Sequence, residues 1–174
     1  KDRNLPRAIV INKIDDDPYE LYLESVRGPR RLLTGYGGNP KADREKWLEA
    51  QNPKHVAISL NGEPTLYSRL GEFLDICHQH GTSTFLVTNG SLPKVIEELD
   101  PLPTQLYVSV DAPNKEVFDR ICKPKFDQGA FHKLEQTLEL LPSLDTRTVC
   151  RHTLIKNESL GYHDDYARLD NLAD

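Results

Sequence analysis

Short apolar segments alternate with helical patterns along most of the chain. Strands are predicted at 55–60, 82–87, 105–110 and 147–155, where aliphatic and aromatic residues gather between turn-forming residues. Helices are predicted at 64–80, 91–99, 114–121 and 129–141, where apolar residues recur at three- and four-residue spacing. Ser91 and Asn114 stand where they would cap two of these helices. Strands and helices that alternate through short loops build a parallel sheet, so the pattern predicts the α/β fold class.

The predicted strands have two unlike faces. In 55–61, one face carries Val56, Ile58 and Leu60, and the other carries Ala57, Ser59 and Asn61. The segment 105–111 repeats this arrangement, with small or polar residues alternating with aliphatic ones. One aliphatic face for helices and one polar face fit a partial (βα) barrel with a parallel sheet better than a sheet covered on both sides.

Residues 1–50 are less regular. A strand is predicted at 7–13, a helix is predicted to begin at 15–18 and run through 21–26, and 35–40 is a glycine-rich loop. No lysine–serine pair follows this loop, as a phosphate-binding loop requires, so we interpret it as a plain turn. A length of 174 residues suits a single domain.

Composition and charge narrow the class of protein. Hydrophobic residues make up 37% of the chain, yet no apolar run reaches the length of a membrane span. The N-terminus has no signal-peptide pattern, so we expect a cytoplasmic protein without a membrane partner. The net charge of −5 does not by itself indicate a nucleic-acid partner. The tight cluster of Arg27, Arg30 and Arg31 is interpreted as a solvated helix end.

The cysteines do not form a recognisable framework. Cys77, Cys122 and Cys150 are odd in number and widely spaced, which argues against a set of disulfides. None of them lies at C-x-x-C spacing, so we predict no metal ligand in the chain. They are expected to be buried or half-buried thiols in a reducing compartment.

Polar residues gather at the predicted carboxyl ends of the strands, which is where βα folds bind ligands. The candidate binding residues are Asn61, Gly62, Glu63, Thr88, Asn89, Ser109, Asp111, Arg151 and Thr153. A carboxylate such as Glu63 binds an ammonium group, and a guanidinium such as Arg151 binds a carboxylate. Hydroxyl and amide groups suit a ribose. Together they predict a zwitterionic or sugar-bearing ligand, although Glu63 taken alone is more typical of a helix N-terminus and Asp111 is equally typical of a turn.

Four segments of the sequence carry a family resemblance. They are 57–67 (AISLNGEPTLY), 85–90 (FLVTNG), 103–113 (PTQLYVSVDAP) and 147–156 (RTVCRHTLIK). The first two resemble the radical S-adenosylmethionine (SAM) enzymes. The last two are similar to one branch of them, the 4-demethylwyosine synthases of tRNA wybutosine biosynthesis, in their archaeal form without a flavodoxin domain. The similarity runs from about Asp16 to Tyr166.

This resemblance implies a partial barrel that binds SAM and a four-iron four-sulfur cluster. It implies that a 5′-deoxyadenosyl radical converts N1-methylguanosine, next to the anticodon of phenylalanine tRNA, to 4-demethylwyosine with pyruvate as carbon donor. Glu63 would then hold the SAM amino group. Arg151 and Thr153 would reach the SAM carboxylate or ribose, and Thr88, Asn89, Ser109 and Asp111 would line the ribose and methionine side. No catalytic residue and no electron donor are assigned.

The sequence departs from the family at the cluster. The family holds its cluster with a C-x-x-x-C-x-x-C loop after the first strand, and residues 1–47 contain no cysteine. We therefore expect residues 1–174 to be a single but incomplete radical SAM core, lacking the cluster loop and a C-terminal part. The backbone is expected to be discontinuous between Arg7 and Pro18. Lys13 is not assigned the pyruvate-binding role of the family.

Two alternatives remain open. The chain would be a non-catalytic SAM- or RNA-binding relative if the cysteines are truly missing. A lysine at the end of a barrel strand, Lys156, also permits a Schiff-base, aldolase-like enzyme.

Overall fold

A computed structural model describes residues 16–124, 129–155 and 162–174. The helices are α1 (Pro18–Leu32), α2 (Arg44–Glu49), α3 (Leu70–Gln79), α4 (Pro93–Glu97), α5 (Lys115–Ile121), α6 (Ala130–Leu140) and α7 (His163–Ala173). The strands are β1 (His55–Ile58), β2 (Ser83–Thr88), β3 (Gln105–Val110) and β4 (Arg147–His152). Single 3-10 turns occur at Tyr36–Gly38, Pro64–Leu66 and Leu141–Ser143. The predicted strand at 7–13 and most of the window for the predicted chain break lie outside the described residues, as does Lys156.

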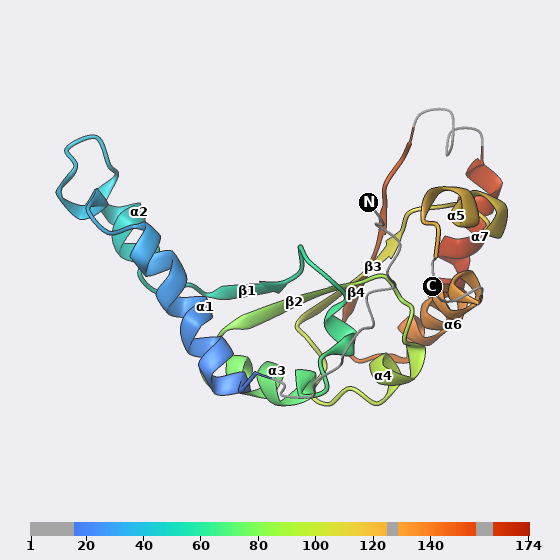
Figure 1. The fold of residues 1–174 in the computed structure, drawn as a ribbon, viewed down its shortest axis with the longest axis horizontal. Coiled ribbons are helices and arrows are strands. Elements are labelled where there is room, and N and C mark those ends of the chain that lie inside the picture. Colours follow the sequence, from blue (N-terminus) through green and yellow to red (C-terminus); the bar gives the residue numbers. More distant parts are fainter. Residues whose placement is uncertain (1–15, 125–128, 156–161) are drawn as a thin grey trace, which may run out of the picture.

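The strands form one parallel sheet in the order β1-β2-β3-β4. The register places Phe85 beside Ala57 and Gln105, and Ser109 beside Arg151. Each crossover between neighbouring strands contains a helix (Figure 1). The α/β class and the parallel sheet predicted from the sequence are confirmed.

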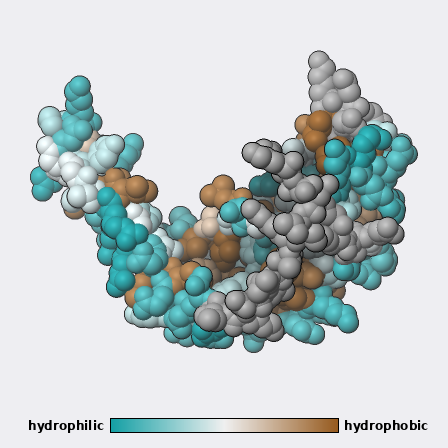
Figure 2. Space-filling view, viewed as in Figure 1, coloured by the Kyte–Doolittle hydropathy of each residue, from teal (hydrophilic) through white to brown (hydrophobic). Residues whose placement is uncertain are grey.

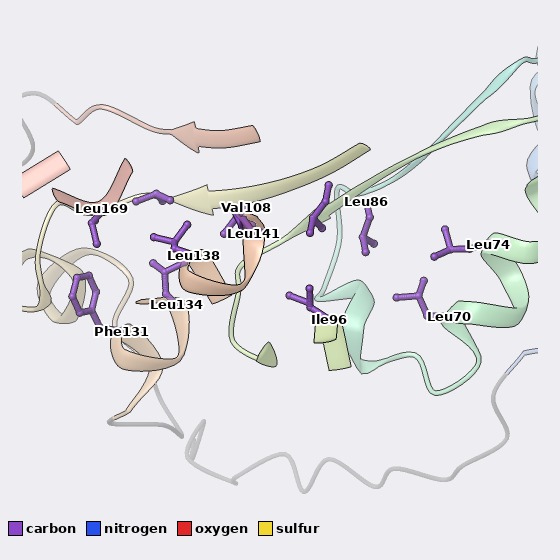
Figure 3. Packing of buried hydrophobic residues seen from close by; sticks show 12 residues of the cluster. Leu70, Leu74, Leu86, Ile96, Val108, Phe131, Leu134, Leu138, Leu141 and Leu169 are labelled. Atoms are coloured by element: carbon purple, nitrogen blue, oxygen red, sulfur yellow. The ribbon is translucent and has the colours of Figure 1, made fainter. Parts of the chain in front are cut away.

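The core fills one side of this sheet. Leu86 on β2 and Leu106, Val108 and Val110 on β3 are fully buried there. They pack against α3, α4, α6 and α7 through a cluster (Figure 3) whose other members are Leu70, Leu74, Ile96, Phe131, Leu134, Leu138, Leu141 and Leu169. Burial of aliphatic side chains between a sheet and its crossover helices is the main source of stability in such a fold.

The opposite side of the sheet is only partly covered. Along β2 and β3 every second residue is half-buried, among them Phe85, Val87, Tyr107 and Ser109. Figure 2 shows a hollow between the arm formed by α1 and α2 and the end that carries α5 and α7, with hydrophobic surface on its floor. The one-sided arrangement of helices fits the partial barrel predicted from the alternation.

The predictions for Leu60 and Ser91 were wrong. Strand β1 ends at Ile58, and Leu60 adopts a left-handed φ of 83° with a relative exposure of 104%. The left-handed residue breaks the alternation that would have turned Leu60 toward the helices. Ser91 does not cap α4; its backbone N–H instead donates to the side chain of Asn89.

The helix predicted at 64–80 is divided. A 3-10 turn at Pro64–Leu66 is followed by α3, because Tyr67 between them has an extended ψ of 113°. The Tyr67 hydroxyl donates to the Asp16 carbonyl at 2.6 Å, which ties this break to the start of α1. Helix α1 itself runs further than predicted, to Leu32, and Asp17 caps it by accepting the N–H groups of Tyr19 and Glu20.

No helix in the described ranges is long and apolar enough to span a membrane.

Candidate functional site

The carboxylate of Glu63 joins the loop after β1 to the end of β2. Its Oε1 accepts the hydroxyls of Thr65 and Thr88, each at 2.7 Å, and the Thr65 N–H at 3.2 Å. Its Oε2 accepts the N–H of Asn89 at 2.8 Å. Thr65 and Thr88 are almost fully buried, so these bonds replace water for their hydroxyls. The structure thus brings three of the predicted residues, Glu63, Thr88 and Asn89, into contact.

This geometry gives Glu63 a structural role beside the predicted one. It is the N-cap of the turn Pro64–Leu66, as the alternative interpretation from the sequence proposed. Among the described residues, three donors use Oε1 fully, whereas Oε2 has one donor and retains capacity to accept another. A ligand ammonium group would therefore bind at Oε2.

Replacing Glu63 by Ala is expected to lower the free energy of unfolding by about 2 kcal/mol, because buried hydroxyls and N–H groups lose their acceptor. Urea denaturation of the chain measures this loss. Lys94→Ala, an exposed change on α4, serves as control and is expected to leave stability nearly unchanged. Equal stability of the Glu63→Ala variant and the wild type would show that these bonds contribute nothing.

Ser109 and Arg151 form a second group on the open side of the sheet. They are direct partners in the β3–β4 register, and Arg151 Nη2 donates to Ser109 Oγ at 3.3 Å. The side chain of Arg151 is exposed, and it forms no ion pair with any of the described residues. A guanidinium held by one neutral hydroxyl keeps most of its donors for a ligand carboxylate or phosphate.

Asp111 follows β3 and has an unsatisfied oxygen. Its Oδ1 is buried, and among the described residues it has no hydrogen-bond partner. A buried carboxylate oxygen without a donor is costly, and such atoms are commonly completed by a ligand or a water molecule. Asp111 can therefore accept a hydrogen bond from a hydroxyl or ammonium group of a ligand.

The remaining predicted residues lie nearby in sequence but make fewer contacts. Asn61 and Gly62 are exposed in the loop after β1, where Gly62 adopts a φ of 77° with open space around it. Thr153 is exposed just beyond β4. Because Thr88 pairs with Val108 and Ser109 pairs with Arg151, the two groups stand at the ends of adjacent strands. Their convergence on one bound molecule stays a prediction.

The cysteines do not fit an iron–sulfur cluster. Cys77 is buried in α3 beside Tyr22 and Phe73, Cys150 lies on β4 and packs against the core, and Cys122 is exposed after α5. Burial raises the pKa of the Cys77 thiol to about 11, and burial followed by nearby carboxylates does the same for Cys150. Both shifts disfavour the thiolate form that binds a cluster. Across the described part of the chain no group of metal-ligating residues is found.

Thr65 is a contact residue of this region that the sequence analysis missed. The signal was available, because a hydroxyl residue two positions after a carboxylate commonly forms such a local turn.

Comparisons with known proteins show the family of this chain. The model of the Radical SAM superfamily matches residues 30–169. S-adenosyl-L-methionine-dependent tRNA 4-demethylwyosine synthases from Pyrococcus horikoshii and Methanocaldococcus jannaschii are 46% and 40% identical to this chain. The alignments cover 88% and 98% of this chain but 46% and 54% of those proteins, so the chain spans about half the length of these curated relatives.

Solved structures show the same likeness. A structure of TYW1 with a lysine–pyruvate adduct bound superposes with a TM-score of 0.77 at 39% identity, over 89% of this chain and 52% of that one. A crystal structure of archaeal TYW1 gives 0.76 at 36% identity, over 91% of this chain and 53% of that one.

Proposed function

This chain belongs to the radical SAM superfamily, and from that premise we propose that it carries the SAM-binding part of a tRNA-modifying enzyme, a 4-demethylwyosine synthase. The observation that supports this most is the pair Ser109 and Arg151 on the open side of the sheet, at the edge where βα folds bind ligands. Relatives that are named for this activity, at 46% and 40% identity, support the proposed chemistry.

The proposed reaction converts N1-methylguanosine of phenylalanine tRNA to 4-demethylwyosine, with pyruvate as carbon donor. A lysine–pyruvate adduct in a structurally similar protein supports the choice of pyruvate. Within this chain we assign binding roles only. Arg151 binds the SAM carboxylate, Asp111 Oδ1 accepts a SAM donor group, and Glu63 Oε2 receives the ammonium group while the other oxygen holds the strand end.

The iron–sulfur cluster of the superfamily is not assigned to residues of this chain. The three cysteines lie in separate places, so no step through a cluster is derived from them. The separation of the three cysteines favours a second candidate function, a SAM- or RNA-binding relative without radical chemistry. The Schiff-base alternative rests on Lys156, which the structure does not describe, and a cytoplasmic location likewise stays a prediction.

Nucleoside analysis of the host's tRNA tests the proposed function. Deleting the gene that encodes this chain is expected to remove 4-demethylwyosine and its derivatives from phenylalanine tRNA and to leave N1-methylguanosine in their place. Mass spectrometry of digested tRNA measures both, and restoring the wild-type gene is the control. Unchanged nucleosides in the deletion strain would refute the synthase and leave the non-catalytic relative as the better account.

A further inference from the structure

The arm at the amino end of β1 is built differently from the rest of the molecule. We define residues 27–54, which include the second half of α1, the turn Tyr36–Gly38 and α2, as the basic tip. It projects away from the sheet (Figure 1). The buried contacts of α1 come from its first half, where Tyr22 packs with Phe73 and Cys77. The basic tip is thus presented to solvent rather than used to complete the core.

The basic tip concentrates positive charge. It holds seven of the 22 Lys and Arg residues but three of the 27 Asp and Glu residues, which gives a net charge of +4 in a chain of net charge −5. Arg27 and Arg31 share one carboxylate, that of Glu24, at 3.7 Å and 2.9 Å. Lys41, Arg44 and Lys46 are exposed, and within the described residues they form no ion pair. These three cations are therefore available to an anionic partner, whereas Asp43, Glu45 and Glu49 on the same segment balance their charge.

The basic tip is also held in a defined shape. Arg30 donates to the Gln51 carbonyl at 2.5 Å and to the Asn52 side chain at 3.2 Å, which ties the end of α1 to the segment after α2. The Trp47 indole donates to the Leu33 carbonyl at 3.3 Å. Its ring covers Gly37 so closely that a Cβ there would lie 2.8 Å from Trp47 Cζ2.

This packing leaves one aromatic ring outside. Tyr36, beside Gly37, keeps a relative exposure of 53% on the turn that Trp47 supports. An exposed aromatic ring on the same tip as exposed lysine and arginine side chains is a combination that suits RNA, because cations contact the phosphates and a base stacks on the ring. An anionic membrane would instead be anchored best by Trp47, which is turned inward.

We propose that the basic tip is an RNA contact surface, in which Lys41, Arg44 and Lys46 bind phosphates and Tyr36 stacks on an unpaired base. This inference rests on the proposed function for the choice of tRNA as partner. The basic tip lies beyond the amino end of β1, whereas the candidate SAM site lies at the carboxyl ends of the strands. It therefore adds affinity by holding a part of the tRNA remote from the reacting base.

The test measures binding of the chain to an unmodified phenylalanine tRNA transcript over a range of salt concentrations. The double variant Arg44→Ala with Lys46→Ala is expected to bind roughly tenfold more weakly near 0.1 M salt, and to reduce the slope of log affinity against log salt by about 2. The control is Lys94→Ala with Arg168→Ala, which removes the same charge from α4 and α7 and is expected to change the affinity little.

Two variants of Tyr36 distinguish base stacking from electrostatic attraction. Tyr36→Ala is expected to weaken tRNA binding at least about fivefold with an unchanged salt slope, and Tyr36→Phe is expected to retain the affinity. Equal losses in both double variants would show diffuse attraction and overturn the inference, as would undetectable tRNA binding by the wild type. If the variants lost affinity for vesicles of anionic phospholipid but kept their affinity for tRNA, the inference would be overturned in favour of a membrane. The nucleoside analysis decides the proposed function independently of all these outcomes.

Discussion

Replacing Arg151 by Ala is expected to weaken SAM binding by roughly ten- to a hundredfold, because a charge-assisted hydrogen-bond pair to the SAM carboxylate is lost. Arg151 is exposed on the open side of the sheet and is held by Ser109 alone among the described residues, so its removal leaves no buried group without a partner. The fold and the unfolding midpoint should therefore stay close to those of the wild type. Equilibrium dialysis with labelled SAM measures the affinity.

The chain offers a matched control on the same strand. Arg147 also faces the open side of β4, but it pairs in register with Gln105 at the amino end of β3. Arg147→Ala removes the same charge from the same face and is expected to change SAM affinity by less than about threefold, in keeping with a long-range surface charge effect. Similar losses in the two variants would show that SAM responds to general charge and not to a site at the carboxyl ends.

Replacing Leu86 by Ala is expected to lower the free energy of unfolding by about 2–5 kcal/mol, the usual range for a fully buried leucine. Leu86 lies on β2, one of the two inner strands, has no exposed surface and contacts the cluster formed with α3 and α4 (Figure 3). Its loss removes apolar burial and leaves a cavity that the surrounding helices cannot fill completely. Urea denaturation followed by circular dichroism measures the change.

Leu60→Ala is the corresponding control, because Leu60 is fully exposed after β1 and its truncation is expected to change stability by less than about 0.5 kcal/mol. If truncating either leucine lowered the free energy of unfolding by the same amount, the assignment of the core to the helix-covered side of the sheet would be wrong.

Much of the fold could be predicted because local pattern and tertiary burial agree. The alternation in 105–110 matches β3 residue for residue, and Asn114 caps α5 through the Val117 N–H as expected. The predictions were wrong where a single backbone conformation overrides periodicity, as with the left-handed Leu60 and the extended Tyr67. Helix α7 was missed although Tyr166, Leu169 and Leu172 have helical spacing, because that apolar set is small beside its acidic residues.

The candidate site was predictable in part for a related reason. Alternation placed Ser109 and Arg151 on the open side, and the parallel register then made them neighbours across 42 residues of chain. The bond between Glu63 and Thr88 could not be predicted, because Thr88 belongs by alternation to the helix-covered face and only the turn of the loop brings Glu63 to it. The unsatisfied oxygen of Asp111 is likewise a property of packing and not of sequence pattern.

Binding of SAM at the carboxyl ends of β1 to β4 can be followed residue by residue with backbone amide NMR during a titration with SAM. The shifted signals are expected to cluster in 61–63, 88–89, 109–111 and 151–153, while the signals of the basic tip and the helix-covered side stay unchanged. Shifts confined to the basic tip or to α3 and α4, or spectra that do not change in a large excess of SAM, would contradict it.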